Sequence, residues 1–182
     1  MMFSQHIRRP IQLISILGAL AILGGCASGA TKEGMTTVNF EAPTKHAKTV
    51  SVKVSGGQET SPTGRAQISD EAFTAALVDS INKSKTFSQV VQGKGGDYEL
   101  GVNIISLDRP TFGASFTVKM EAGWSLKKSS TGEVVLQKVI KSEHTATMSD
   151  AMVGATRMLL AIEGAARNNI TQGLTEISQL KL

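Results

Sequence analysis

A chain of 182 residues, 41% of them hydrophobic, is long enough for one domain with a substantial core. Its formal net charge is +4 at pH 7, but two arginines, Arg8 and Arg9, lie within the first 25 residues, which leaves 17 basic and 15 acidic side chains in the remainder. This near-balance excludes the strongly basic surface of a nucleic-acid-binding protein. The single cysteine excludes an internal disulfide.

Residues 1–25 have the organisation of a secretory signal peptide. A basic start is followed by a stretch of 13 residues, from Ile11 to Leu23, that is almost entirely apolar. This stretch is shorter than the roughly 20 residues that a membrane-spanning helix needs, but it has the length of a signal-peptide core. The sequence therefore predicts that residues 1–25 are removed by cleavage between Gly25 and Cys26.

The four residues from Leu23 to Cys26, Leu-Gly-Gly-Cys, resemble the lipobox of bacterial lipoproteins. The resemblance implies that the Cys26 sulfur receives a diacylglycerol and that the new amino group receives a third acyl chain; no other cofactor is expected. Because Ala27 is not the aspartate that tends to retain such proteins at the inner membrane, the resemblance also implies an outer-membrane anchor with the domain facing the periplasm. The alternative is an ordinary signal peptide beside a chance cysteine.

Residues 26–48 mix small, polar and charged side chains without periodicity, which predicts a lipidated, flexible tether. From Thr49 three valines alternate with polar residues, which predicts a half-buried strand. The glycine-containing segment 56–67 is then expected to be a loop, either a binding edge or slack chain. These boundaries predict one folded domain over residues 49–182.

Ser69, followed by two acidic residues, has the character of a helix N-cap, and the helix is expected to continue to about Lys85. A short strand and a glycine turn follow. The next strand is predicted to begin at Tyr98 and to end before Pro110.

The segment from Ser115 to Leu126 shows the clearest alternation in the sequence, with a core-type side chain at every second position. Such alternation predicts an antiparallel strand with one face in the core and the other facing solvent or a partner. A turn and a further strand complete a hairpin. The last helix is predicted to begin at an N-cap, Ser149, and to carry one apolar stripe, with a kink or break expected near Gly164.

Together these elements predict an α+β fold. We expect a single antiparallel sheet of about four or five strands with two helices packed on one face, in the order β-α-β-β-β-α. The candidate interaction surfaces are the exposed sheet face, the 56–67 loop and the turn that contains Asp108, Arg109 and Phe112. The alternative for this turn is an ordinary exposed loop.

No residues with the spacing of a catalytic or metal site are found in the sequence. His46 falls in the predicted tether and His144 on a strand, without ligand-spaced partners, so no metal site is expected. Two Ser-x-x-Lys matches, beginning at Ser80 and Ser125, lack the other elements of penicillin-binding enzymes. We therefore expect no enzymatic activity.

The layout resembles small Gram-negative envelope lipoproteins of the YajG type and, more distantly, auxiliary lipoproteins of ABC lipid transporters and penicillin-binding-protein activators. The features that carry the resemblance are the lipobox at Cys26, FTAALVDSINKSKTFSQVV, DYELGVNIISL, the hairpin SFTVKMEAGWSLKKSSTGEVVLQKVIKSEH and a closing alanine-rich helix. The resemblance implies a non-enzymatic accessory protein that binds an envelope protein partner. One alternative is a protein that binds a lipid or peptide in an apolar groove between sheet and helices. The other alternative is an envelope enzyme, which the sequence favours least.

Overall fold

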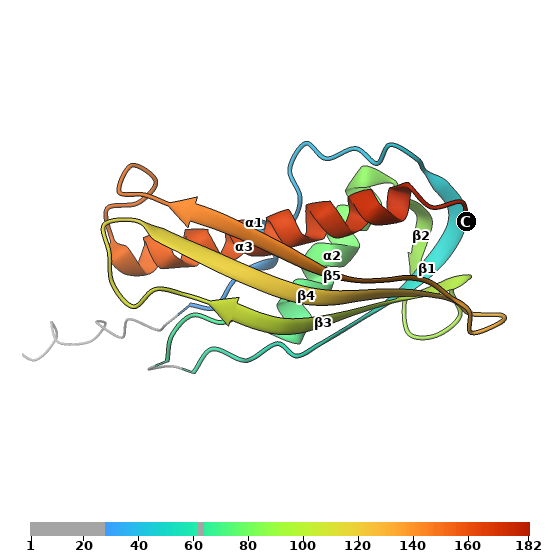
Figure 1. Ribbon diagram of the computed structural model, residues 1–182, viewed down its shortest axis with the longest axis horizontal. Coiled ribbons are helices and arrows are strands. Elements are labelled where there is room, and N and C mark those ends of the chain that lie inside the picture. The colour runs from blue at the N-terminus through green and yellow to red at the C-terminus, as the bar shows by residue number, and fades with distance from the viewer. Residues whose placement is uncertain (1–27, 62–63) are drawn as a thin grey trace, which may run out of the picture.

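Five strands and three helices make up the part of the chain that a computed structural model describes, residues 28–61 and 64–182 (Figure 1). The signal peptide, the cleavage site after Gly25 and the lipidated Cys26 are predictions that lie outside these ranges. In chain order the elements are α1 (Lys32–Met35), β1 (His46–Ser55), α2 (Asp70–Ser84), β2 (Phe87–Val91), β3 (Tyr98–Asp108), β4 (Phe116–Lys128), β5 (Val134–Ala146) and α3 (Gly154–Ser178). No helix in the described ranges is long and apolar enough to cross a membrane.

The strands form a single sheet in the order β2-β1-β3-β4-β5, which confirms the predicted α+β class. The expectation of a wholly antiparallel sheet is wrong at one side, because β1 runs parallel to both of its neighbours. β2 pairs with the first half of β1 and β3 with the second half from the other side, so the short segment 92–97 suffices to cross between them. Alternation indicates which face a side chain occupies, but it carries no information on the direction of the neighbouring strand.

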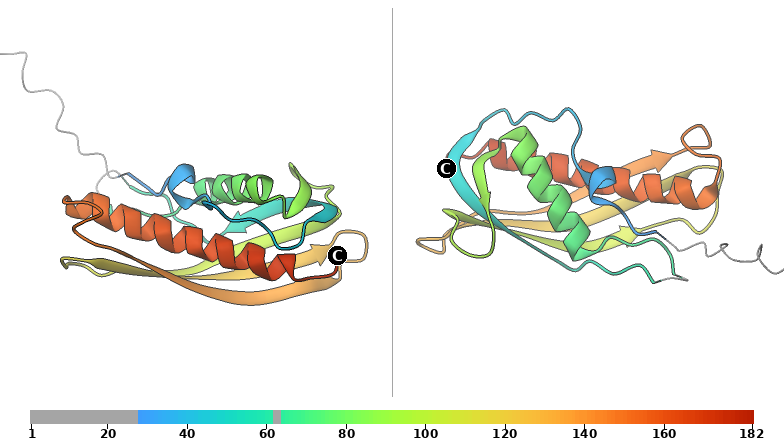
Figure 2. Two further views of the ribbon diagram at one scale, coloured as in Figure 1. Left: turned by 90° about the horizontal axis from the view of Figure 1, so that it is seen from above. Right: turned by 180° about the vertical axis from the view of Figure 1, so that it is seen from behind.

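All three helices lie on one face of the sheet, as Figure 2 shows from above. The core-type residues of β4 point toward them and are all buried: Phe116, Val118, Met120, Ala122, Trp124 and Leu126. The predicted start of α2 is confirmed, since the Ser69 Oγ accepts a hydrogen bond of 3.1 Å from the backbone N–H of Ala72.

The start of α3 differs from the prediction. Ser149 does not cap the helix, which begins at Gly154 after Val153 without a side-chain cap. Instead the backbone N–H and hydroxyl of Thr147 both donate to the Asp150 carboxylate, at 2.7 and 2.8 Å, and form a separate turn. These bonds also lower the pKa of Asp150. The predicted helix start at Ser149 is therefore wrong, because Ser, Thr and Asp favour turns as well as helix N-caps.

α3 continues unbroken through Gly164, contrary to the expected kink. A Cβ at Gly164 would overlap the imidazole of His144, and a Cβ at Gly173 would overlap the Trp124 ring. The two glycines therefore let the helix lie directly on β4 and β5, and this close packing offsets their low helix propensity.

A buried polar network lies at the same contact. Trp124 Nε1 donates to Asn169 Oδ1 at 2.9 Å, and Asn169 Nδ2 donates to the backbone carbonyl of Ile140 at 3.0 Å and to Ser142 Oγ at 3.2 Å. Ser142 Oγ in turn donates to the carbonyl of Ala165 at 2.9 Å. Because each of these polar groups has a partner, the network joins β4, β5 and α3 in one orientation.

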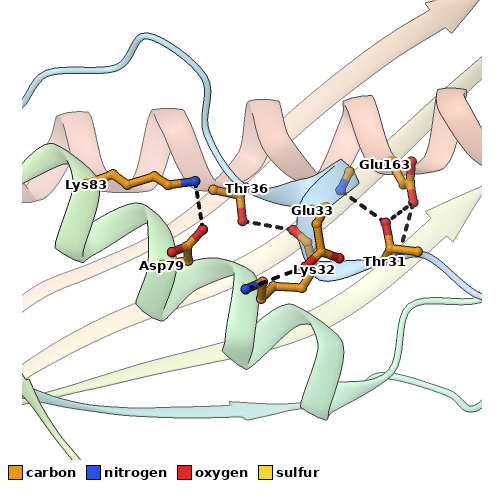
Figure 3. A network of polar contacts seen from close by, with 8 residues as sticks. Thr31, Lys32, Glu33, Thr36, Asp79, Lys83 and Glu163 are labelled. Atoms are coloured by element: carbon orange, nitrogen blue, oxygen red, sulfur yellow. Dashed lines mark hydrogen bonds and ion pairs between the residues drawn. The ribbon is translucent and has the colours of Figure 1, made fainter.

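The predicted tether does not extend to residue 48. Ala30 is already buried and its N–H donates to the Gln67 carbonyl at 2.9 Å. Thr31 caps α1 and donates from both its N–H and its hydroxyl to Glu163 of α3, at 2.9 and 2.7 Å (Figure 3). Met35 is fully buried. The small and polar composition of this segment concealed its contacts with Gln67 and Glu163, which are distant in sequence.

The packing of α3 on the sheet can be tested with Gly173→Ala. We expect the variant to lose about 1–3 kcal/mol of unfolding free energy, since the added methyl must displace the Trp124 ring and strain its bond to Asn169. Urea denaturation measures this loss. Gly154→Ala is the matched control, because a Cβ there meets nothing closer than 3.9 Å; an equal loss in both variants would contradict the packing argument.

Candidate functional site

Two loops lie side by side at one end of the sheet, 109–115 between β3 and β4 and 147–153 between β5 and α3 (Figure 1). They carry four exposed apolar side chains: Phe112 at 85% exposure, Met148 at 49%, Met152 at 78% and Val153 at 64%. We call this set the tip surface. It holds half of the eight large apolar residues that are exposed in the described ranges.

Arg157, in the first turn of α3, holds the two loops together. Its Nη1 donates to the carbonyls of Ala151 at 2.7 Å and Met152 at 3.2 Å, and its Nη2 donates to the carbonyl of Gly113 at 3.4 Å. The guanidinium also lies 5.0 Å from the centre of the Phe116 ring, within cation–π distance. A side chain that is only 6% exposed thus fixes the geometry of an exposed surface.

Arg109 ties the 56–67 loop to the same end of the molecule. Its Nη1 donates to the Ala66 carbonyl, and Arg65 Nη2 donates to the Pro110 carbonyl at 3.3 Å. Burial lowers the pKa of the Arg109 guanidinium, and the charge of Arg65 lowers it further. A cleft of about 240 Å³ lies between this loop and the end of β3, lined among others by Gly57, Ile104 and Arg109.

The structure thus brings together two surfaces that the sequence predicted separately, the 56–67 loop and the Asp108–Phe112 turn. Asp108, the last residue of β3, is exposed, and Phe112 is fully presented to solvent. Arg109 is engaged in holding the loop. The contribution of residues 147–153 was missed, because the last helix was expected to begin at Ser149, whereas it begins at Gly154.

The open face of the sheet is lined by small residues at its centre, with Ile105 and Val139 exposed beside Gly123. A shallow depression of about 330 Å³ is lined by Ser51, Gly101 and Ser125, with Lys53, Lys94 and Lys127 among the residues at its margin. Ile105 packs over Gly123 on the same face. The depression is a feature of the exposed sheet face that the sequence named as a candidate contact surface.

The space between sheet and helices, in which an apolar ligand groove was expected, is filled by the core. Phe73, Leu77, Trp124, Ile162 and Ile170 are at most 1% exposed there. The interior is therefore occupied by the protein's own side chains.

The two histidines within the described ranges, His46 and His144, are both packed into the fold. His46, expected in the tether, is the buried first residue of β1, and its Nε2 lies 3.0 Å from the Ile177 carbonyl. The His144 ring packs against Gly164 of α3. Within residues 28–61 and 64–182, no three His, Cys, Asp or Glu side chains lie close enough together to hold a metal ion.

Comparison with known proteins shows the fold alone. No family model matches the sequence, and no curated protein matches it. Among solved structures, the chain is similar to the DUF330 protein XCC0632 of Xanthomonas campestris, with a TM-score of 0.60, 16% identity and coverage of 79% of this chain and 91% of that one. Protein CT253 of Chlamydia trachomatis has a TM-score of 0.53, 7% identity and coverage of 75% and 99%.

A third match is a minor lipoprotein of Acinetobacter baumannii, with a TM-score of 0.49, 7% identity and coverage of 74% of this chain and 93% of that one. All three identities are below 25%.

The role of Arg157 at the tip surface can be tested with Arg157→Ala. We expect a loss of about 1.5–3 kcal/mol in unfolding free energy, the range for hydrogen bonds from a charged donor, together with faster amide hydrogen exchange in loops 109–115 and 147–153. Arg157→Lys should not restore slow exchange, since an ammonium lacks the planar fork that reaches both loops. Arg167→Ala, on the same helix, is the control; unchanged exchange in Arg157→Ala would contradict the assignment.

Proposed function

We propose that this protein is an envelope lipoprotein, anchored through Cys26 in the outer membrane with its domain in the periplasm, and that it acts as a non-enzymatic accessory module. The observation that carries the proposal is the Leu-Gly-Gly-Cys sequence at residues 23–26, placed directly behind a basic start and a short apolar stretch. Three acyl chains would hold the protein permanently, since two already give stable anchoring. We also propose that the protein is related to the YajG-type lipoproteins.

The length of chain between the anchor and the domain supports the proposal. Thr31 is bonded to Glu163, so only four residues, 27–30, separate Cys26 from a fixed point of the fold. A domain held this close to the membrane meets other membrane-bound proteins at high effective concentration. A weak domain contact can therefore suffice for an accessory role, and the open sheet face offers the area for an envelope protein partner.

The way the buried polar groups are used supports a non-enzymatic role. Glu163 accepts hydrogen bonds from Thr31, Arg157 donates to carbonyls of two loops, and His46 is bonded to a carbonyl of α3. Each of these groups is engaged in holding the fold. The alternative function, binding of a lipid tail or peptide between sheet and helices, is disfavoured by the filled interior.

Cys26→Ser tests the anchor. Expressed in a Gram-negative host, the wild-type protein should incorporate labelled palmitate and fractionate with the outer membrane, and the variant should lose both because serine offers no thiol for the diacylglycerol. Ser28→Ala is the control and should behave as wild type. A Cys26→Ser protein that still fractionates with the outer membrane would refute the lipobox assignment.

Ala27→Asp tests the choice of membrane. An aspartate directly after the lipidated cysteine is the inner-membrane retention signal that the sequence lacks, so the variant should move to the inner-membrane fraction while it keeps its acyl chains. Density-gradient separation of the two membranes measures the shift, and Ala27→Asn serves as the uncharged control. Wild-type protein already in the inner-membrane fraction would contradict the proposed location.

A further inference from the structure

The tip surface lies at the same end of the molecule as residue 28, the first described residue after the proposed anchor. Both views in Figure 2 place the start of the described chain and the two loops at the same end. Hydrogen bonds connect them step by step: Ala30 bonds Gln67, and the neighbouring Ala66 accepts from Arg109, at the base of the 109–115 loop.

The short connection limits how far the domain can stand from the bilayer. From Cys26 to Thr31 a fully extended chain spans at most about 17 Å. Thr31 is bonded to Glu163, which lies nine residues into α3, so the N-terminal end of the helix reaches about 14 Å beyond this point. A Cys26 at the headgroup level therefore allows the loops that flank the start of α3 to reach the membrane surface.

We propose that the tip surface docks into the lipid headgroup region of the membrane that holds the anchor, with Phe112 and Met152 inserted. This inference rests on the proposed lipidation of Cys26. The chemistry of the surface fits a bilayer, because its four exposed side chains are all apolar. Arg65, which donates to the Pro110 carbonyl beside them, is exposed and can meet lipid phosphates.

The charged groups around the tip surface are compatible with this position. Two of the arginines at this end, Arg109 and Arg157, donate to backbone carbonyls. The Asp150 carboxylate accepts two bonds from Thr147, and Asp108 lies at the end of β3, at the base of the 109–115 loop. Docking would fix one orientation of the domain, in which the strands run along the membrane normal. The open sheet face would then stay free for a partner.

Phe112→Trp in the full, lipidated protein provides the test. The protein is reconstituted into vesicles of phosphatidylethanolamine and phosphatidylglycerol, with or without bromine on the acyl chains. Because tryptophan settles near the headgroup level, we expect brominated lipid to quench the added fluorescence about twofold. The native Trp124 is buried and forms the common background, measured on the wild-type protein. Met152→Trp, on the second loop, should be quenched in the same way.

Thr131→Trp is the matched control, in the turn between β4 and β5. The 13 residues of β4 separate this turn from the tip surface by about 40 Å, so its fluorescence should be unaffected by bromine. Both positions 112 and 131 are exposed, and near-ultraviolet circular dichroism verifies that each variant is folded.

Vesicle flotation separates the two proposals. Protein that floats with the vesicles, with Phe112→Trp and Met152→Trp quenched no more than Thr131→Trp, would overturn membrane docking and leave the anchor in place; a protein partner or a second copy would then cover the tip surface. Wild-type protein that carries no acyl chain and fails to float would overturn both. Quenching at both tip positions supports the docking.

Discussion

The contact between α3 and the sheet is the constraint on which the rest of the structure depends. Gly173 allows the Trp124 ring to lie against the helix backbone, and Asn169 bonds both that ring and the backbone of β5. Close packing and satisfied buried polar groups together permit one helix position and penalise others. The tip surface and the N-terminal segment that leads to Cys26 are both attached to the helix held in this way.

Two such attachments lie within the first ten residues of α3. Arg157 fixes the loops that carry the tip surface, and Glu163 fixes the segment that leads to Cys26. Since one rigid helix carries both, the distance between Thr31 and the tip surface is set by helix geometry. The same side chains also explain why buried charges in this domain are structural, because each is bonded to a loop or a terminus.

The parts of the fold that were predictable are those with local causes. Ser69 caps α2 through its own next turn, and the alternation of β4 follows from one face meeting the helices. The direction of β1 and the attachment of Thr31 to Glu163 have non-local causes. Ser149 could have capped a helix, but the bonds between Thr147 and Asp150 provided a competing local structure.

The sequence by itself was enough to predict the membrane location and the fold class. The residues around Cys26 indicate lipidation, and periodicity indicates one sheet with helices on one face. Only the tertiary structure decided that residues 30–45 belong to the domain and that Phe112 and Met152 share a surface. The physical reason is that motifs and periodicity are local, whereas a hydrogen bond such as that between Thr31 and Glu163 joins residues 132 positions apart. Such contacts become visible only when the chain is folded.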